Sequence, residues 1–197
     1  MEPNKEQLRA TYEKLSDDKI IQLATGEAAK LRPEALEILK EIIKERNLSE
    51  DIERGIDIQF KAIDEDTLAE YVELIRNQPC PVCNAAIEKL NASQIQTVYS
   101  FIVFTTYNKD FKIACPGCLT TANNNAMVKS ALLGWWGLPW GIIRTIQALL
   151  FNAKMKKQNR LPESSEVLKA FVYSNLGRIE TNRNNPAELQ SIITDIR

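Results

Sequence analysis

The sequence predicts an α+β protein that is mostly helical, with one β-hairpin between two helical parts. Apolar residues recur at helical spacing over residues 1–77 and again over 162–197. Between these parts, the run 95–106 is rich in β-branched and aromatic residues and is followed by turn formers and a short alternating segment, which indicates two antiparallel strands. An apolar segment, 130–153, is interrupted by Gly and Pro and therefore predicts a helical hairpin.

The composition is that of a globular protein without histidine. Apolar residues make up 44% and charged residues 26% of the 197 residues, with only 7 Gly and 8 Pro, which excludes a disordered or collagen-like chain. Without histidine there is no Ser-His-Asp or Cys-His catalysis, no histidine-ligated zinc and no histidine pH switch. The sequence also contains no paired acid and base, no glycine-rich phosphate loop and no partnered nucleophile, so we expect no enzyme.

The N-terminal residues carry no signal-peptide pattern, because 1–6 include neither a basic nor an apolar region. We therefore expect a cytoplasmic protein whose four cysteines lie in a reducing compartment. Stable disulfides are rare there, which favours a metal as the reason for the cysteines.

The net charge of -1 conceals two parts of opposite sign. Residues 1–79 contain twelve basic and nineteen acidic side chains, whereas residues 80–197 contain thirteen and seven. Between residues 105 and 160 there are eight basic residues and one acidic residue. Such a segment suits the phosphates of lipid or nucleic acid, or else packs on the acidic part of the same chain.

Residues 1–77 predict an acidic domain of helices joined by short turns. Ser16 is a typical cap for the second helix, and Pro33 occupies the place of a first helical residue. Asn47 is suited to end the third helix in a left-handed conformation, with Leu48 folding back on that helix. The apolar stripes of these helices are core positions and include no candidate site.

The β-hairpin and the C-terminal helices complete the predicted fold. The first strand covers 95–106, Tyr107–Asp110 supplies the turn, and Phe111–Ala114 returns as the second strand. Pro162 breaks the chain before a C-terminal pair of helices, the second of which begins at Pro186. The predicted parts are the acidic helical domain, 1–77; the hairpin and the apolar segment, 78–161; and the C-terminal helix pair, 162–197.

All four cysteines lie in two C-x-x-C pairs, Cys80-Pro81-Val82-Cys83 and Cys115-Pro116-Gly117-Cys118. Two residues between thiolates let one tight turn direct both sulfurs at one ion, and two such turns complete the tetrahedron that zinc prefers. The predicted hairpin returns the second pair to the first across 31 intervening residues, which is the plan of a zinc ribbon. We expect structural Zn2+ with no open position for chemistry. The predicted ligands are Cys80, Cys83, Cys115 and Cys118.

Two other interpretations of the cysteines remain open at this point. C-P-x-C resembles the redox pair of thioredoxin-like proteins, although that pair belongs to a βαβ pattern that this sequence lacks. Iron is the second, because four thiolates suit both metals. Zinc knuckles often place Gly after the second cysteine of a pair, where this chain has Asn84 and Leu119. We expect a left-handed Asn84, and a different backbone path at the second pair with Gly117 as its flexible residue.

The segment 134–141, Gly-Trp-Trp-Gly-Leu-Pro-Trp-Gly, contains all three tryptophans. Its glycines and proline should end one helix and start another at Pro139, which places the tryptophans at the tip of a helical hairpin. The uncharged stretch 130–143 has 14 residues, fewer than the about 20 of a spanning helix, and Arg144 follows it. We expect a contact surface for a protein or an anionic membrane, with burial in the core as the alternative. The predicted surface comprises Trp135, Trp136 and Trp140, with Lys154, Lys156, Lys157 and Arg160 at its edge.

Two groups of residues resemble known sequences. Leu15-Ser16-Asp17-Asp18, Leu31-Arg32-Pro33-Glu34-Ala35 and Glu45-Arg46-Asn47-Leu48 resemble a short helical module at the start of many uncharacterised bacterial proteins. The paired C-P-x-C knuckles followed by the segment 134–141 are similar to a group of uncharacterised bacterial zinc-ribbon proteins. The resemblance implies a zinc ribbon behind a helical module, and it carries no established activity.

The sequence therefore predicts a non-enzymatic zinc-binding adaptor that docks on a protein or membrane surface. We expect it in the cytoplasm, with a peripheral position at the membrane, and we expect no small-molecule substrate. The alternative is a nucleic-acid-binding zinc ribbon. For that role the predicted hairpin offers only Lys109 and Lys112, and the sequence pI is near 5.7, where such proteins often exceed about 9.

Overall fold

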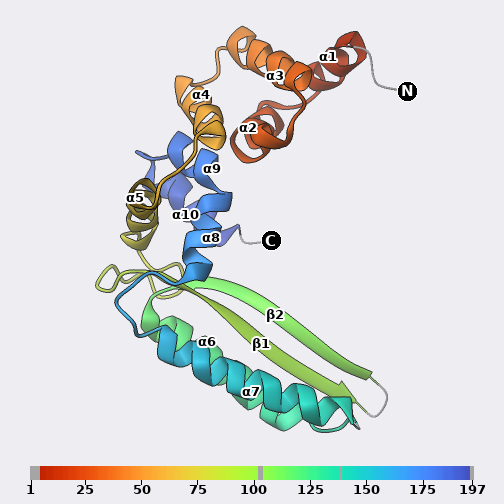
Figure 1. Cartoon of the computed structure of the whole chain (residues 1–197), viewed down its shortest axis with the longest axis vertical. Coiled ribbons are helices and arrows are strands. Elements are labelled where there is room, and N and C mark those ends of the chain that lie inside the picture. Colours follow the sequence, from red (N-terminus) through yellow and green to blue (C-terminus); the bar gives the residue numbers. More distant parts are fainter. Residues whose placement is uncertain (1–4, 102–103, 138, 196–197) are drawn as a thin grey trace. The chain divides into compact units, whose positions relative to one another are not determined.

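The computed structural model describes residues 5–101, 104–137 and 139–195. Its described part has the predicted α+β, mostly helical class, with one two-stranded antiparallel sheet (Figure 1). The predicted combination of N-terminal helices, a four-cysteine hairpin, a helical hairpin and C-terminal helices is confirmed.

Contacts between Cα atoms divide the chain into two compact units. Unit 1 comprises Met1–Tyr71 and Phe171–Ile192, and unit 2 comprises Val72–Ala170 and Ile193–Arg197. The C-terminal part that the sequence predicts, 162–197, is thus divided between the two units.

The helices that precede the first strand are α1 (Lys5–Glu13), α2 (Asp17–Glu27), α3 (Pro33–Glu45), α4 (Glu50–Asp57) and α5 (Glu65–Arg76). Two short 3-10 helices, η1 (Ala28–Lys30) and η2 (Ile58–Phe60), follow α2 and α4. The strands are β1 (Asn91–Phe101) and β2 (Phe104–Ala114), and they are followed by α6 (Pro116–Leu133) and α7 (Trp140–Gln158). The last helices are α8 (Glu166–Ser174), α9 (Leu176–Thr181) and α10 (Pro186–Thr194).

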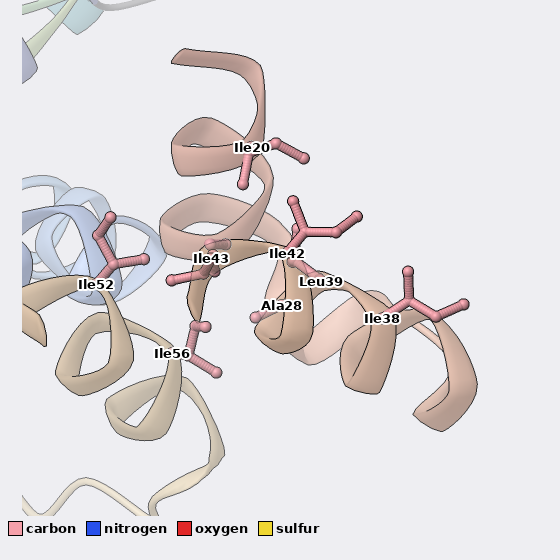
Figure 2. Packing of buried hydrophobic residues seen from close by; sticks show 9 residues of the cluster. Ile20, Ala28, Ile38, Leu39, Ile42, Ile43, Ile52 and Ile56 are labelled. Carbon is pink, nitrogen blue, oxygen red and sulfur yellow. The ribbon is translucent and has the colours of Figure 1, made fainter. Parts of the chain in front are cut away.

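A core of aliphatic side chains, most of them isoleucines, holds unit 1 together (Figure 2). The helices from α2 to α4 present these residues at three- and four-residue spacing, so one apolar face of each helix is removed from water. That burial is the main favourable term for folding. The residues labelled in Figure 2 are Ile20, Ala28, Ile38, Leu39, Ile42, Ile43, Ile52 and Ile56.

The helix signals of the sequence are confirmed in unit 1. The Ser16 side chain accepts a hydrogen bond from a backbone N–H in the first turn of α2, and Pro33 is the first residue of α3. Asn47 has a φ of 50°, in the left-handed region. Beyond it, the N–H of Leu48 donates to the carbonyl of Ile43 (3.0 Å), which closes the end of α3.

β1 and β2 form an antiparallel hairpin, but the predicted turn at Tyr107–Asp110 is wrong. Phe101 pairs with Phe104, so the chain reverses between these two residues, and 107–110 lies within β2. The pairing of two eleven-residue strands outweighs the local turn preference of Asn and Asp. Residues 102–103 of the predicted first strand lie outside the described residues.

α6 and α7 form the predicted helical hairpin and pack along β1 (Figure 1). α6 ends at Leu133 and α7 begins at Trp140, with Pro139 as its N-cap residue. The break between the helices therefore falls within the Gly- and Pro-containing segment that predicts it.

The connection between α6 and α7 lies directly against the tip of the β-hairpin. A Cβ atom added to Gly137 would lie 2.2 Å from Oγ of Ser100, and one added to Gly141 would lie 2.6 Å from the same atom. Only glycine permits so close an approach. Ser100 is in turn paired across the hairpin with Thr105, at 2.8 Å between the hydroxyl oxygens. Both hairpins consequently turn at the same end of unit 2.

Side chains from the two helices satisfy the edge of β1 that faces away from β2. The N–H of Gln96 donates to Oδ1 of Asn152 (3.1 Å), and Nδ2 of Asn152 donates to the Gln96 carbonyl (2.6 Å). One side-chain amide thus takes the place of a neighbouring strand. The N–H of Val98 likewise donates to Oγ of Ser130 (3.0 Å). These contacts close an edge that would otherwise be open to pairing with another chain.

The space between α6, α7 and β1 is therefore lined by small and polar side chains. Asn123 accepts hydrogen bonds from Nδ2 of Asn159 (2.8 Å) and from Oγ of Ser93 (3.4 Å), and its own Nδ2 donates to Asn152 (3.1 Å). We call this buried set the polar seam. Its members are Ser93, Asn123, Ala126, Ser130, Thr145, Ala148, Asn152 and Asn159.

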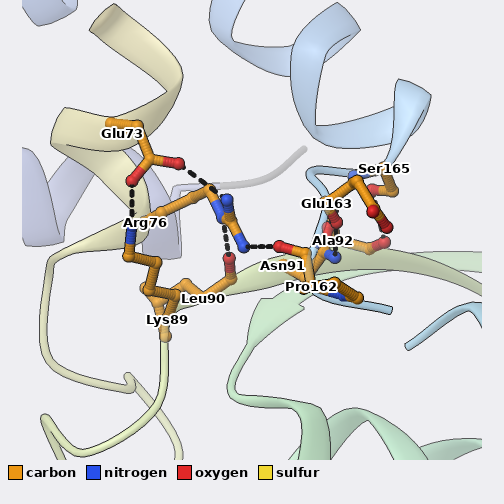
Figure 3. A network of polar contacts seen from close by, with 9 residues as sticks. All are labelled: Glu73, Arg76, Lys89, Leu90, Asn91, Ala92, Pro162, Glu163 and Ser165. Atoms are coloured by element: carbon orange, nitrogen blue, oxygen red, sulfur yellow. Dashed lines mark hydrogen bonds and ion pairs between the residues drawn. The ribbon is translucent and has the colours of Figure 1, made fainter. Parts of the chain in front are cut away.

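Arg76, the last residue of α5, fixes the loop that leads to β1 (Figure 3). Its nearly buried guanidinium donates to the carbonyls of Leu90 (3.2 Å) and Pro162 (2.6 Å) and to Glu73 (2.6 Å). Hydrogen bonds from Lys89 and then from Arg76 lower the pKa of the Glu73 carboxyl, although partial burial opposes them. Arg76, before the first cysteine pair, and Leu90, after it, are thereby held together.

We predict that Asn152→Ala lowers the free energy of unfolding of unit 2 by about 2–4 kcal/mol, because it leaves the N–H and carbonyl of Gln96 buried without partners. Urea unfolding followed by tryptophan emission measures this, since all three tryptophans belong to unit 2. The matched control is Asn125→Ala, an exposed asparagine of α6, which should change stability by no more than about 0.5 kcal/mol. Equal effects of the two changes would contradict the role given to Asn152.

Candidate metal centre

The first cysteine pair lies in the loop between α5 and β1 and forms a tight turn. The N–H of Asn84 donates to the carbonyl of Cys80 (2.8 Å), and the N–H of Cys80 donates to the carbonyl of Ala85 (2.9 Å). Asn84 has a φ of 57°, so the predicted left-handed residue after the pair is confirmed. Asparagine is among the few residues other than glycine that accept this conformation.

The second pair lies at the start of α6 instead of in a second loop turn. Cys115 is the N-cap residue, Pro116 is the first residue of the helix, and Cys118 follows in the first turn. The expectation that Gly117 supplies a flexible turn is wrong, since no described glycine has a positive φ. Proline at the first helical position favours a helix here, and the helix N-terminus favours negative charge on nearby sulfurs.

The two pairs bring all four Sγ atoms within 4.8 Å of one another. The sulfurs of Cys83 and Cys115 are 3.8 Å apart, which is too long for a disulfide bond of about 2.05 Å. Four thiolates around one zinc at about 2.3 Å lie about 3.8 Å from each other, so the cluster has the size of a tetrahedral site. Cys80 and Cys115 are buried, Cys118 is half-buried and Cys83 is exposed. The predicted ligand set is thus brought together as a metal-binding group.

Backbone N–H groups around the cluster favour a negative charge on Cys80. Burial raises the pKa of the Cys80 thiol, but hydrogen bonds from the N–H groups of Cys115, Cys83 and Val82 outweigh burial and lower this pKa to about 7. The first of these bonds, from the N–H of Cys115, spans 3.3 Å.

Cys115 and Cys118 lose protons less readily on their own. Burial raises the pKa of the Cys118 thiol, and hydrogen bonds with Cys115 and Cys83 raise it further. Burial is also the main reason why the pKa of Cys115 is raised. A cation is therefore needed before all four sulfurs are thiolates at once. Four sulfurs around one ion leave no position for a substrate, which suits a structural centre and not a catalytic one.

No known family model, curated protein or solved structure matches this chain. Arguments about function therefore start from the metal centre and from the surface of unit 2.

The three tryptophans that the sequence predicts as a contact surface are exposed where both hairpins of unit 2 turn. The exposed fractions are 41% for Trp135, 67% for Trp136 and 63% for Trp140, so the alternative of burial in the core does not hold. The neighbouring phenylalanines of the β-hairpin tip are exposed as well. We define the apolar end as these exposed residues together with one leucine of α6: Phe101, Phe104, Leu132, Trp135, Trp136 and Trp140.

The predicted basic residues do not lie at the edge of this surface. Trp140 is the first residue of α7, whereas Lys156 and Lys157 are in its last turn. Lys154 follows Trp140 by fourteen helical residues, a rise of about 21 Å. The uninterrupted helix thus separates residues that are near in sequence. Lys154, Lys156, Lys157 and Arg160 form a separate basic cluster toward the end of unit 2 where α6 begins.

Within the described residues, no helix has the length and the apolarity needed to cross a bilayer.

Other exposed apolar residues were not predicted as part of the surface. Val128 of α6 and Ile143, Ile146 and Leu150 of α7 are exposed as well. The signal that distinguishes them is the recurrence of Asn, Ser, Thr and Gly on the opposite faces of the same helices, which makes those faces the buried ones.

We predict that Asn84→Val speeds metal loss about tenfold, because a β-branched residue in the left-handed region costs about 1–2 kcal/mol. Asn84→Gly is the matched control and should retain metal as the unchanged protein does. The measurement is the rate at which a chromogenic chelator takes metal from the loaded full-length chain. Identical rates for the two variants would show that the turn at Asn84 does not support the site.

Proposed function

We propose that this chain is a non-enzymatic adaptor in which structural zinc stabilises unit 2 and the apolar end docks on a membrane or protein surface. The observation that carries the proposal is the exposure of six large apolar side chains at one end of a unit whose opposite end holds four clustered cysteines. The other class, nucleic-acid binding, is less well supported because β2 offers Lys109 and Lys112 as its only basic residues.

Zinc is the metal that best fits the cysteines. A set of four thiolates with tetrahedral spacing is typical of structural zinc, which has no redox chemistry and needs no further ligand. The centre ties the loop before β1 to the first turn of α6. Metal binding would therefore contribute directly to the stability of a unit in which many small and polar side chains are buried.

The apolar end has the properties of a docking surface. Large apolar groups gathered on one surface commonly mark interaction sites, whereas single exposed apolar residues are ordinary. Tryptophan and phenylalanine also dominate the energetics of interfaces because each buries a large area. In unit 2 they are displayed by two hairpin tips that the close contacts of Gly137 and Gly141 hold together.

We predict about one zinc per chain in protein purified without added metal, and its loss in Cys115→Ser. Elemental analysis measures the metal. The variant should lose the native tryptophan emission of unit 2 while the helices of unit 1 persist, because their core lies outside the metal centre. Sub-stoichiometric metal together with a Cys80–Cys83 disulfide under reducing conditions, or iron in place of zinc, would contradict the assignment.

We predict that the apolar end is in contact with another molecule in living cells. A photoactivatable phenylalanine derivative in place of Leu132 should give covalent adducts on illumination of cells that produce the full chain. The matched control is the same group in place of Phe60, an exposed aromatic residue of unit 1, which should give none. Mass spectrometry identifies the adducts, and either lipid or protein supports docking. Absence of adducts at both positions, or equal amounts at both, would refute it.

A further inference from the structure

We infer that the partner of the apolar end is an anionic lipid bilayer, which unit 2 enters end-on to the level of Lys129 and Arg144. The inference rests on the proposed docking function and names its partner. Five features of unit 2 support it, each concerning a different part of the surface or interior.

The exposed faces of both helices change from polar to apolar toward the apolar end. On α6 the exposed residues Thr121 and Asn125 are followed by Val128 and Leu132. On α7 the exposed apolar residues Trp140 and Ile143 come before Arg144, Ile146 and Leu150 follow it, and Lys154 and Lys157 continue the same face. The polarity of the exposed faces therefore changes along the helix axes, which suits insertion by one end.

The interior of unit 2 is packed in the manner of helices in lipid. The polar seam joins α6, α7 and β1 through small residues and side-chain hydrogen bonds, while large apolar side chains face outward. In water, helices associate mainly because they bury apolar side chains between them. In lipid, they associate through close packing of small residues and through interhelical hydrogen bonds.

Three carbonyl groups at the end of α6 are already satisfied. Nε1 of Trp135 donates to the carbonyl of Ala131 (2.7 Å), and Nε1 of Trp136 donates to that of Leu132 (3.3 Å). The Ser130 carbonyl accepts from the N–H of Gly134 (2.8 Å). Since unpaired backbone groups are costly in lipid, these bonds remove a penalty both for the helix end and for the two indole N–H groups.

The tip of the β-hairpin is apolar where a hairpin in water is ordinarily polar. Phe101 pairs with Phe104 at the end of the described ladder, and the sequence 101–104 contains no Gly, Asn, Asp or Pro. Both phenylalanines are exposed, by 67% and 77%. A lipid environment offsets the cost of displaying them.

Each of the two helices carries one basic residue close to the apolar end, at about the same level. Lys129 precedes the end of α6, and Arg144 follows the start of α7, each by about 6–8 Å along its helix. The guanidinium of Arg144 lies 5.5 Å from the centre of the Tyr107 ring, which adds an aromatic residue at this level. No acidic residue occurs in α6 or α7, so phosphate groups meet no negative charge there. The long side chains of Lys129 and Arg144 can reach headgroups while the tip lies deeper.

The experiment uses the zinc-loaded full-length chain with vesicles of phosphatidylcholine alone and of phosphatidylcholine mixed with phosphatidylglycerol. All three tryptophans lie at the apolar end, so intrinsic emission reports on this surface alone. We expect a blue shift with the anionic vesicles that weakens as salt rises. Lipids brominated at different acyl positions should quench the emission most strongly when the bromine is near the headgroup, since insertion is shallow.

Two matched pairs of substitutions test the end-on orientation. Lys129→Gln with Arg144→Gln should weaken binding to anionic vesicles about 25-fold, since each basic residue near the surface contributes about fivefold. Lys154→Gln with Lys157→Gln should weaken it less than about threefold, because these residues lie beyond the screening length of about 8–10 Å from the headgroups. Thermal unfolding checks that both double variants remain folded.

The possible outcomes distinguish a failure of the lipid inference from a failure of the docking proposal. No blue shift with anionic vesicles, or a chain that forms dimers in which the tryptophans are shielded from quencher, would overturn the inference. A larger loss from the Lys154 and Lys157 changes would overturn the end-on orientation. Light-induced adducts at position 132 that contain only protein would remove the lipid while leaving the docking function intact, whereas no adducts at all would remove both.

Discussion

The structure of unit 2 depends on one constraint: β1 has a strand partner on only one side, so its other backbone edge needs hydrogen bonds from elsewhere. α6 and α7 supply them through Asn152 and Ser130. Helices that offer polar side chains to a strand cannot offer a large apolar face to the same place. Their small and polar residues therefore point inward, which brings the backbones close, and their large apolar residues point outward. The exposed apolar residues on the outer faces of α6 and α7 are thus a consequence of how the hairpin is completed.

A metal bound by the four cysteines compensates for the hydrophobic free energy that unit 2 loses by burying small and polar side chains between α6, α7 and β1. The Asn, Ser and Thr side chains of the polar seam contribute less hydrophobic free energy than Leu and Ile would, and each of their hydrogen bonds adds only about 0.5–1.5 kcal/mol net. Four thiolates on one ion supply stability that does not depend on apolar burial. They join the loop before β1 to the first turn of α6, which are the points where the hairpin and the helical pair begin. Arg76 strengthens the same region by binding the carbonyls of Leu90 and Pro162.

Local signals in the sequence predict most of the elements and the ligand set. Ser16, Pro33 and Asn47 act within one turn of themselves, and the two C-x-x-C pairs set their own sulfur spacing. The failures have different physical causes. The turn formers at 107–110 lie inside β2 because strand register outweighs them. Gly117 is helical because Pro116 starts a helix. Lys154 is remote from Trp140 because an unbroken helix carries it away. The sequence did not predict the polar seam. Asn and Ser are ordinarily exposed, and the strand edge whose hydrogen bonds they complete is not evident from the sequence.

The length of α6 explains how one small unit can hold both the metal centre and the apolar end. α6 has 18 residues and begins beside the cysteines, so about 27 Å of helix separates the metal centre from the apolar end. Four thiolates around a divalent ion carry a net charge of about −2, which would be costly in a low-dielectric environment. The cysteines lie at the end where α7 finishes in Lys156 and Lys157, whose positive charges are favourable near such a centre. A charged end that would hold a metal in water and the apolar end that we propose for docking are therefore compatible, because one long helical hairpin spans both.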